Sequence, residues 1–113
     1  MKIFVDADAC PAKKEILEIC RRHKVAPIFV ANVEIPAIAA SSDAQMQIVS
    51  ADFDAADRWI IDRAQVGDLI LTADLLLAQH AARKKVDVIN FSGDALTDEI
   101  VHDLVARREI QQF

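Results

Sequence analysis

The stretch that decides the fold stands at the start of the chain, where residues 2–11 read KIFVDADACP. Three apolar residues in succession after Lys2 predict a short buried strand. Pro11 suits the first turn of a helix, because the N–H that proline lacks has no partner at that position. Asp6 and Asp8 therefore lie where a strand passes into a helix. In an open α/β sheet, ligands bind at this edge, beyond the carboxyl ends of the strands, so the two acids indicate a site.

Strand and helix patterns alternate along the rest of the chain, with no internal repeat and no linker. Further strands are expected over residues 27–31, 47–50, 69–72 and 86–90, and helices over residues 11–24, 54–66 and 75–85. A last helix, capped by Thr97, is expected to run to about residue 108. Residues 33–45 are interpreted as a loop with a short helix. The alternation predicts a single α/β domain over residues 1–113, in which a mostly parallel sheet of about four to five strands is flanked by helices.

The composition limits the class of protein. Of the 113 residues, 53% are hydrophobic and 27% are charged, which is typical of one globular domain. No apolar run reaches the length of a membrane span and the N-terminus enters a strand pattern, so we expect a cytoplasmic protein with no membrane partner. Cys10 and Cys20 lack the spacing of a zinc site, and no disulfide is expected. The formal charge of −5 disfavours a strongly basic nucleic-acid-binding protein.

Aspartates follow three of the predicted strands in groups. These groups are Asp6 with Asp8, Asp52 with Asp54 and Asp57, and Asp74. If the strands are parallel, all three groups lie at the same edge of the sheet. Crowded carboxylates repel one another and raise one another's pKa, and a bound Mg²⁺ or Mn²⁺ removes that penalty. Two such ions, roughly 3.5–4 Å apart, can activate water and stabilise the leaving oxygen of a phosphodiester.

Helix capping is the structural alternative for these acids. Asp54 and Asp57 can form a capping box at the start of one helix, and Asp74 can cap the next. Asp6 can hold an Asx turn. Capping does not explain why Asp6 and Asp8 occur together after one strand, nor why three acidic groups share an edge. The joint pattern favours a site.

Three segments resemble the YaiI/YqxD family, whose members are small bacterial proteins of uncharacterised function. The segments are VDADACP at residues 5–11, FDAAD at residues 53–57 and GDLILTAD at residues 67–74. That family in turn resembles PIN and NYN domains, which are metal-dependent ribonucleases with a Rossmann-like sheet. The resemblance therefore implies a single PIN-like, Rossmann-like domain and a ribonuclease activity that requires Mg²⁺ or Mn²⁺.

The resemblance also implies roles for individual residues. The acids implied as catalytic and metal-binding residues are Asp6, Asp8, Asp57 and Asp74. Thr72 would orient Asp74 or a water molecule, and Asp52 and Asp54 are supporting or capping candidates. The chain departs from PIN nucleases in lacking a clear glutamate in its middle segment.

Other chemistry-bearing residues have simpler interpretations. His23, His80 and His102 lack metal-ligand spacing and are expected to be solvated or packed. Trp59 is expected in the core. Lys13, Lys14 and Arg58 lie near the predicted acidic edge, where they could guide a phosphate.

The leading hypothesis is therefore a Mg²⁺- or Mn²⁺-dependent phosphodiesterase that acts on RNA. The first alternative is a non-catalytic metal- or nucleic-acid-binding regulatory module. The second is a haloacid-dehalogenase-like phosphatase, in which the first acid of an Asp-x-Asp pair is the nucleophile. In such phosphatases a Gly-Asp motif follows a strand. Here Gly67 and Asp68 precede the predicted strand at residues 69–72, which argues against a phosphatase. The expected partners are RNA and a second copy of the chain, with which it would form a homodimer.

Overall fold

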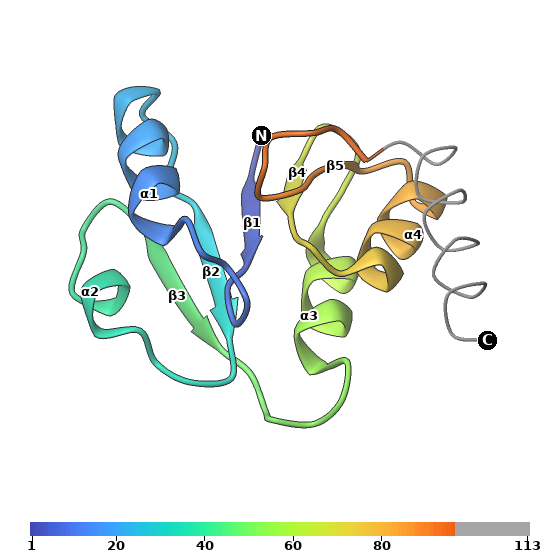
Figure 1. Ribbon diagram of the computed structural model, residues 1–113, viewed down its shortest axis with the longest axis horizontal. Coiled ribbons are helices and arrows are strands. Elements are labelled where there is room, and N and C mark those ends of the chain that lie inside the picture. The colour runs from blue at the N-terminus through green and yellow to red at the C-terminus, as the bar shows by residue number, and fades with distance from the viewer. Residues whose placement is uncertain (97–113) are drawn as a thin grey trace.

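The computed structural model describes residues 1–96, and within this range the chain forms five strands and four helices (Figure 1). In chain order the elements are β1 (Ile3–Asp6), α1 (Lys13–Arg22), β2 (Ile28–Ala31), α2 (Pro36–Ala39), β3 (Gln45–Ile48), α3 (Ala55–Arg63), β4 (Leu69–Leu71), α4 (Leu75–Arg83) and β5 (Asp87–Ile89). All neighbouring strands are parallel. The predicted α/β class with a parallel sheet is confirmed.

The strand order is β3-β2-β1-β4-β5, so the direction of winding reverses at β1. The chain moves outward from β1 to β3 and then returns through α3 to β4 on the other side of β1. In the paired register, Asp6 lies beside Val30 of β2, and Val5 lies beside Leu71 of β4. The carboxyl end of β1 therefore stands at the point where the order reverses, which is the ligand-binding position of an open α/β sheet.

Two apolar cores cover the two faces of the sheet. Along β1, Phe4 belongs to one core, while Ile3 and Val5 belong to the other, because successive side chains of a strand point to opposite faces. Residues of α3 and α4 pack in the core that contains Phe4, and residues of α1 and α2 pack in the core that contains Val5. Phe4 and Phe29 are almost fully buried, and burial of side chains of this size stabilises the fold by about 1.5–3 kcal/mol each.

Several element bounds differ from the expected ones. Strand β3 covers Gln45–Ile48 and not residues 47–50, because its register is set by pairing with β2, in which Ile28 lies beside Gln45. The segment at 33–45 does contain the expected short helix, α2. Helix α3 ends at Arg63, before the expected residue 66, since Ala64 is already extended. The expected helix after Thr97 lies outside the described residues.

Among residues 1–96, no helix has the length and apolar character needed to cross a bilayer.

Candidate functional site

A chain of hydrogen bonds links Asp6, Thr72 and Asp74 across β1 and β4. Asp6 is the last residue of β1, and its Oδ2 accepts a hydrogen bond from the Thr72 hydroxyl at 2.8 Å. The same hydroxyl oxygen accepts from the backbone N–H of Asp74 at 2.9 Å. Thr72 is fully buried, so its one hydroxyl proton is directed at Asp6 and its acceptor position is used by Asp74. Thr72 was predicted to orient Asp74 or a water molecule; in the structure its hydroxyl donates to the Asp6 carboxylate and contacts only the backbone N–H of Asp74.

Asp74 caps α4, as the helix-capping alternative predicted. Its Oδ1 accepts from the backbone N–H groups of Leu76 at 2.9 Å and Leu77 at 3.4 Å. The side chain thus pairs two N–H groups at the start of α4 that have no acceptor within the helix. Capping occupies Oδ1, and Oδ2 takes part in neither bond. Asp74 can therefore cap the helix and still offer an oxygen to a ligand.

Asp8 joins the loop after β1 to the end of β2. Its Oδ1 and Oδ2 lie 3.1 and 3.3 Å from the backbone nitrogen of Asn32, which donates to them. Asp8 is exposed, whereas Asp6 is partly buried. The two acids of the Asp-x-Asp pair thus have separate anchors, Thr72 directly after β4 and Asn32 directly after β2.

Asp57 is held by a residue that the sequence did not single out. It lies in the first turn of α3 with 7% of its surface exposed, and both carboxylate oxygens are within 3.0–3.1 Å of Nδ1 of His80 on α4. His80 was expected to be solvated or packed without a role. Its partner lies 23 residues away, so only the packing of α3 against α4 reveals the pair.

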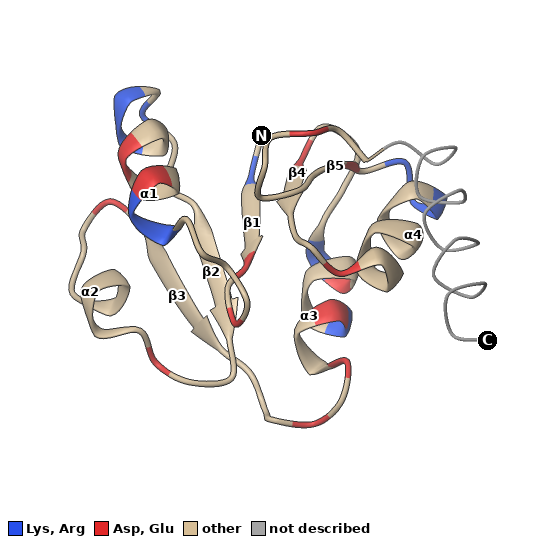
Figure 2. Cartoon of the chain, in the orientation of Figure 1, with Lys and Arg blue, Asp and Glu red and all other residues tan. Residues whose placement is uncertain are grey.

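Asp6 is affected electrostatically by the other three acids. Burial raises the pKa of Asp6, the Thr72 hydrogen bond opposes that effect, and the negative charges of Asp74, Asp8 and Asp57 raise the pKa further. Acidic residues accordingly line the loops and helix starts at this edge of the sheet (Figure 2). Asp6 is therefore within electrostatic range of acids from two distant segments, at Asp57 and Asp74.

The donor chemistry fits a hard divalent cation, since carboxylate oxygens are what Mg²⁺ and Mn²⁺ prefer. Within residues 1–96, however, no three acidic, histidine or cysteine side chains are arranged as a group that could hold a metal. The oxygens of Asp8 and Asp57 point at Asn32 and His80 respectively. The ligand set of Asp6, Asp8, Asp57 and Asp74 stays a prediction.

Asp52 and Asp54 lie in the loop that leads into α3. Asp54 stands at the N-cap position with φ 60, in the left-handed region, and its side chain accepts no helix N–H. It pairs instead with Arg58, with Nε and Oδ1 3.2 Å apart. The capping box expected for Asp54 and Asp57 does not form. Asp52 accepts from the hydroxyl of Ser50 at 3.2 Å.

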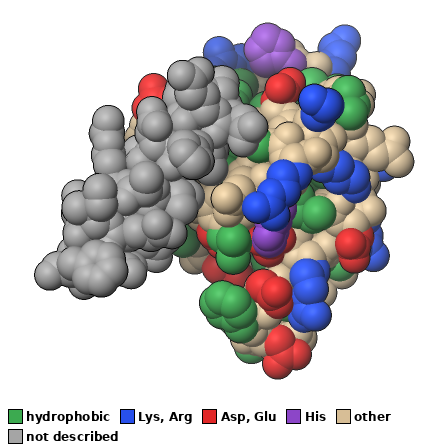
Figure 3. Space-filling model, turned by 90° about the vertical axis from the view of Figure 1, so that its right-hand side faces the viewer, with side chains coloured by type: hydrophobic (Ala, Val, Ile, Leu, Met, Phe, Trp, Pro, Cys, Tyr) green, Lys and Arg blue, Asp and Glu red, His purple; other side chains and the backbone are tan. Residues whose placement is uncertain are grey.

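The three basic candidates differ in their surroundings. Lys13 donates from Nζ to the carbonyl of Cys10 at 2.6 Å, and Arg58 pairs with Asp54. Lys14 is exposed on α1. Basic and acidic side chains are interspersed on the face seen in Figure 3. A phosphate-binding role for Lys13, Lys14 and Arg58 stays a prediction.

Two further residues have structural roles. Asp68 accepts from the backbone N–H groups of Lys2 and Gln65, each at 2.9 Å, at the edge of the sheet opposite to Asp6. Trp59 packs against the core with its ring edge-on to Phe4, and the Arg63 guanidinium lies 4.0 Å from its ring centroid. The expectation that Trp59 belongs with the core is confirmed.

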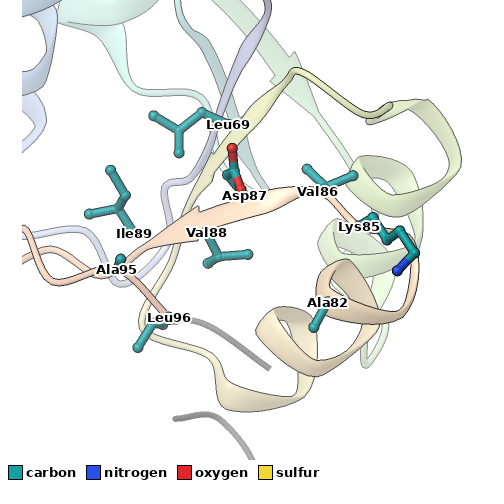
Figure 4. Close-up of a pocket in the computed structure, with 9 residues that line it drawn as sticks. All are labelled: Leu69, Ala82, Lys85, Val86, Asp87, Val88, Ile89, Ala95 and Leu96. Carbon is teal, nitrogen blue, oxygen red and sulfur yellow. The ribbon is translucent and has the colours of Figure 1, made fainter. Parts of the chain in front are cut away.

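A pocket of about 500 Å³ runs along β5 and the end of α4 (Figure 4). Apolar side chains such as Val86, Val88 and Ala82 line it, together with Lys85 and Asp87. None of the predicted site residues lines this pocket. The acidic edge and the β5 pocket are therefore separate features.

The fold and the acidic edge together define a doubly wound α/β protein with carboxylates at its topological switch point. The model of the "uncharacterized BCR, YaiI/YqxD family" matches residues 4–113. The chain belongs to this family. The relation to PIN and NYN domains stays a prediction.

Curated relatives carry the family's uncharacterised status in their names. The UPF0178 proteins of Brucella melitensis biotype 2 and of Brucella abortus (strain 2308) are each 37% identical to this chain over 108 residues, a match that covers 96% of this chain and 67% of each relative. The UPF0178 protein of Brucella ovis is 36% identical over the same length. No solved structure matches the chain.

Proposed function

We propose that this protein is a Mg²⁺- or Mn²⁺-dependent phosphodiesterase that cleaves RNA in the cytoplasm. Its catalytic and metal-binding acids would be Asp6, Asp8, Asp57 and Asp74. The observation that carries the proposal is the Asp6 carboxylate, which the buried Thr72 hydroxyl holds in place; burial raises its pKa, and the charges of three further carboxylates raise it further. Repulsion of this kind is unfavourable in the free protein, and a divalent cation would remove it.

Each acid in the proposed set is oriented by a different donor. Thr72 fixes the Asp6 carboxylate, the backbone of Asn32 fixes Asp8, and His80 fixes Asp57. The N–H groups at the start of α4 fix Asp74. When bound, the cation would lower the pKa of a coordinated water molecule and stabilise the leaving oxygen of a phosphodiester. The donors in the protein would hold the carboxylates in position.

The first test is stabilisation by metal. Mn²⁺ should raise the melting temperature of the wild type, since a ligand at 100 times its Kd stabilises a fold by about 2.7 kcal/mol. Asp6→Asn and Asp74→Asn should abolish this increase. Asparagine keeps an acceptor for Thr72 in the first variant and is a good N-cap in the second, so both should fold. Asp87→Asn, an exposed acid at the opposite end of the sheet, is the matched control and should respond to Mn²⁺ as the wild type does.

The second test is cleavage. Wild-type protein with Mn²⁺ should cut a single-stranded RNA, and Asp6→Asn and Asp74→Asn should not, whereas Asp87→Asn should retain the activity. If Mn²⁺ fails to raise the melting temperature, the metal site does not exist. If Mn²⁺ raises the melting temperature and no RNA is cut, the catalytic proposal is wrong.

A non-catalytic metal- or nucleic-acid-binding regulatory module is the second candidate. One observation favours its nucleic-acid-binding form over a metal-dependent enzyme: the described acids do not form a ready-made metal-binding group. RNA binding without cleavage would establish this alternative, and stabilisation by Mn²⁺ would then show whether the module also binds metal. In a haloacid-dehalogenase-like phosphatase, the aspartate of the Gly67-Asp68 pair would have to lie in the same site as Asp6. Asp68 instead lies at the opposite edge of the sheet from Asp6.

A further inference from the structure

Phe53 is the most exposed of the large apolar side chains within residues 1–96, with 86% of its surface open to solvent. It lies in the loop between β3 and α3, flanked by Asp52 and Asp54. A phenylalanine in this position gains none of the stabilisation that burial of its side chain would give. An aromatic residue presented in this way needs an explanation.

The usual structural explanation does not apply to Phe53. An apolar residue just before an N-cap often packs against the fourth residue of the helix, as a hydrophobic staple. The N-cap of α3 is Asp54, and the fourth residue of the helix is Arg58. Arg58 is exposed and its Nε pairs with Asp54, while Phe53 is almost fully solvated. No staple is formed, so Phe53 does not fix the start of α3.

The loop that carries Phe53 is nevertheless well anchored. Asp52 accepts from the Ser50 hydroxyl, and the Asp52 carbonyl accepts from the N–H of Ala55 at 3.2 Å. On the other side, the Asp54 carbonyl accepts from the N–H of Arg58 at 2.9 Å, and the side chains of these two residues pair. The aromatic ring is thus held out on a hydrogen-bonded turn, which lowers the entropy lost on binding.

Phe53 also lies close to the acidic edge. It stands in the loop directly before the N-cap of α3, and Asp57 lies in the first turn of that helix. Figure 3 shows hydrophobic side chains projecting beside acidic ones at the lower end of the visible face.

We infer that Phe53 stacks on an unpaired base of a single-stranded RNA whose neighbouring phosphate lies at the acids. The inference rests on the proposed function and adds the class of substrate to it. An exposed aromatic ring binds a base face regardless of sequence, and base faces are accessible in single strands but covered in duplexes. Arg58, whose exposed guanidinium pairs with Asp54 at the start of α3, is the nearest basic residue to Phe53 in the sequence and would contact the backbone of the same strand.

The experiment measures binding of a fluorescein-labelled short oligouridine by fluorescence anisotropy in Ca²⁺, with the RNA checked for cleavage on a gel. Phe53→Ala and Phe53→Leu should each weaken binding about tenfold, and Phe53→Trp should bind at least as tightly as the wild type. Leucine keeps apolar bulk without an aromatic face, so it separates stacking from general hydrophobic contact. Val66→Ala is the matched control, because Val66 is 75% exposed in the turn before β4, at the opposite end of the sheet, and its affinity should not change.

Two further ligands test whether Phe53 contacts the bases. A ribose-phosphate chain that lacks bases should bind wild type and Phe53→Ala equally weakly, and an oligouridine–oligoadenosine duplex should bind less tightly than the single strand. Equal affinity of wild type and Phe53→Ala for oligouridine overturns the inference. So does a smaller particle mass for Phe53→Ala in light scattering, which would make Phe53 a contact between copies of the chain.

Failure of the inference can be told apart from failure of the proposed function. If Phe53→Ala binds and cleaves like the wild type, only the inference is wrong. If the wild type neither binds oligouridine nor is stabilised by Mn²⁺, the proposed function and the inference are both wrong.

Discussion

At the scale of the residue, the decisive group is the hydroxyl of Thr72. A buried hydroxyl must find partners for its proton and its lone pairs, and here the partners are the carboxylate of Asp6 and the N–H of Asp74. Valine has the same shape without the hydroxyl and would leave both groups unpartnered. One small side chain thus sets the positions of two acids from different strands.

Asp6→Asn is expected to stabilise the metal-free protein at neutral pH. The pKa of Asp6 is raised, chiefly by burial and further by the neighbouring acids, so the ionised carboxylate destabilises the fold. For an acid with a raised pKa, stability falls as the pH rises through the folded-state pKa. The variant should therefore gain about 1 kcal/mol in the free energy of unfolding at pH 7, a common gain for relieving strain at a functional site.

Urea denaturation in the presence of a chelator measures this difference. The gain should vanish below the ordinary aspartate pKa of about 3.9, where the wild-type carboxyl is also neutral. A wild type that is more stable than Asp6→Asn at pH 7 would contradict the electrostatic account of the site.

At the scale of the element, Asp57 and His80 join α3 to α4. The carboxylate is buried, and a buried acceptor that loses its partner destabilises the fold by about 1–3 kcal/mol. His80→Ala should therefore lower the free energy of unfolding by that amount. The double variant Asp57→Ala/His80→Ala should have nearly the same free energy of unfolding as Asp57→Ala alone, since the first substitution already breaks the pair. The double-mutant cycle measures this coupling, and purely additive effects would show that the pair contributes nothing.

Asp68 also joins two segments of the chain. At the other edge of the sheet, it links the start of β1 to the turn before β4. Burial raises its pKa, but the N–H groups of Lys2 and Gln65 and the charge of Lys2 outweigh that effect and leave the pKa lowered. An acid with a lowered pKa stabilises the fold above its ordinary pKa, and this contribution is lost as the pH falls through the folded-state value. Asp68→Asn should lose about 1–2 kcal/mol at pH 7 by urea denaturation, because one N–H loses a charged acceptor. The loss should shrink in acid, and a deficit that is independent of pH would rule out the charge as its cause.

At the scale of the whole molecule, the sequence predicted the layout well and the local contacts less well. Apolar runs such as residues 28–31 stand out because parallel strands are buried on both faces, and the aspartates after them predicted the shared edge. The register of β3 could not be predicted, since it depends on pairing with β2. Nor could the partner of Asp57, because the packing of two helices has no local signature. Asp54 followed the N-cap pattern in sequence, but its left-handed backbone turns the side chain to Arg58.

The charge of the whole molecule leads to the last prediction. The chain has a formal charge of −5, and its acids gather at the edge proposed to meet RNA. Without a divalent cation, this edge should repel a polyanion, so removal of metal by a chelator should abolish oligouridine binding. Addition of Ca²⁺ should restore binding to the wild type without cleavage, and it should not restore binding to Asp74→Asn. Filter binding across a Ca²⁺ titration measures both effects. Tight binding in the chelator would mean that RNA meets another surface, because carboxylates without a bound cation repel phosphate.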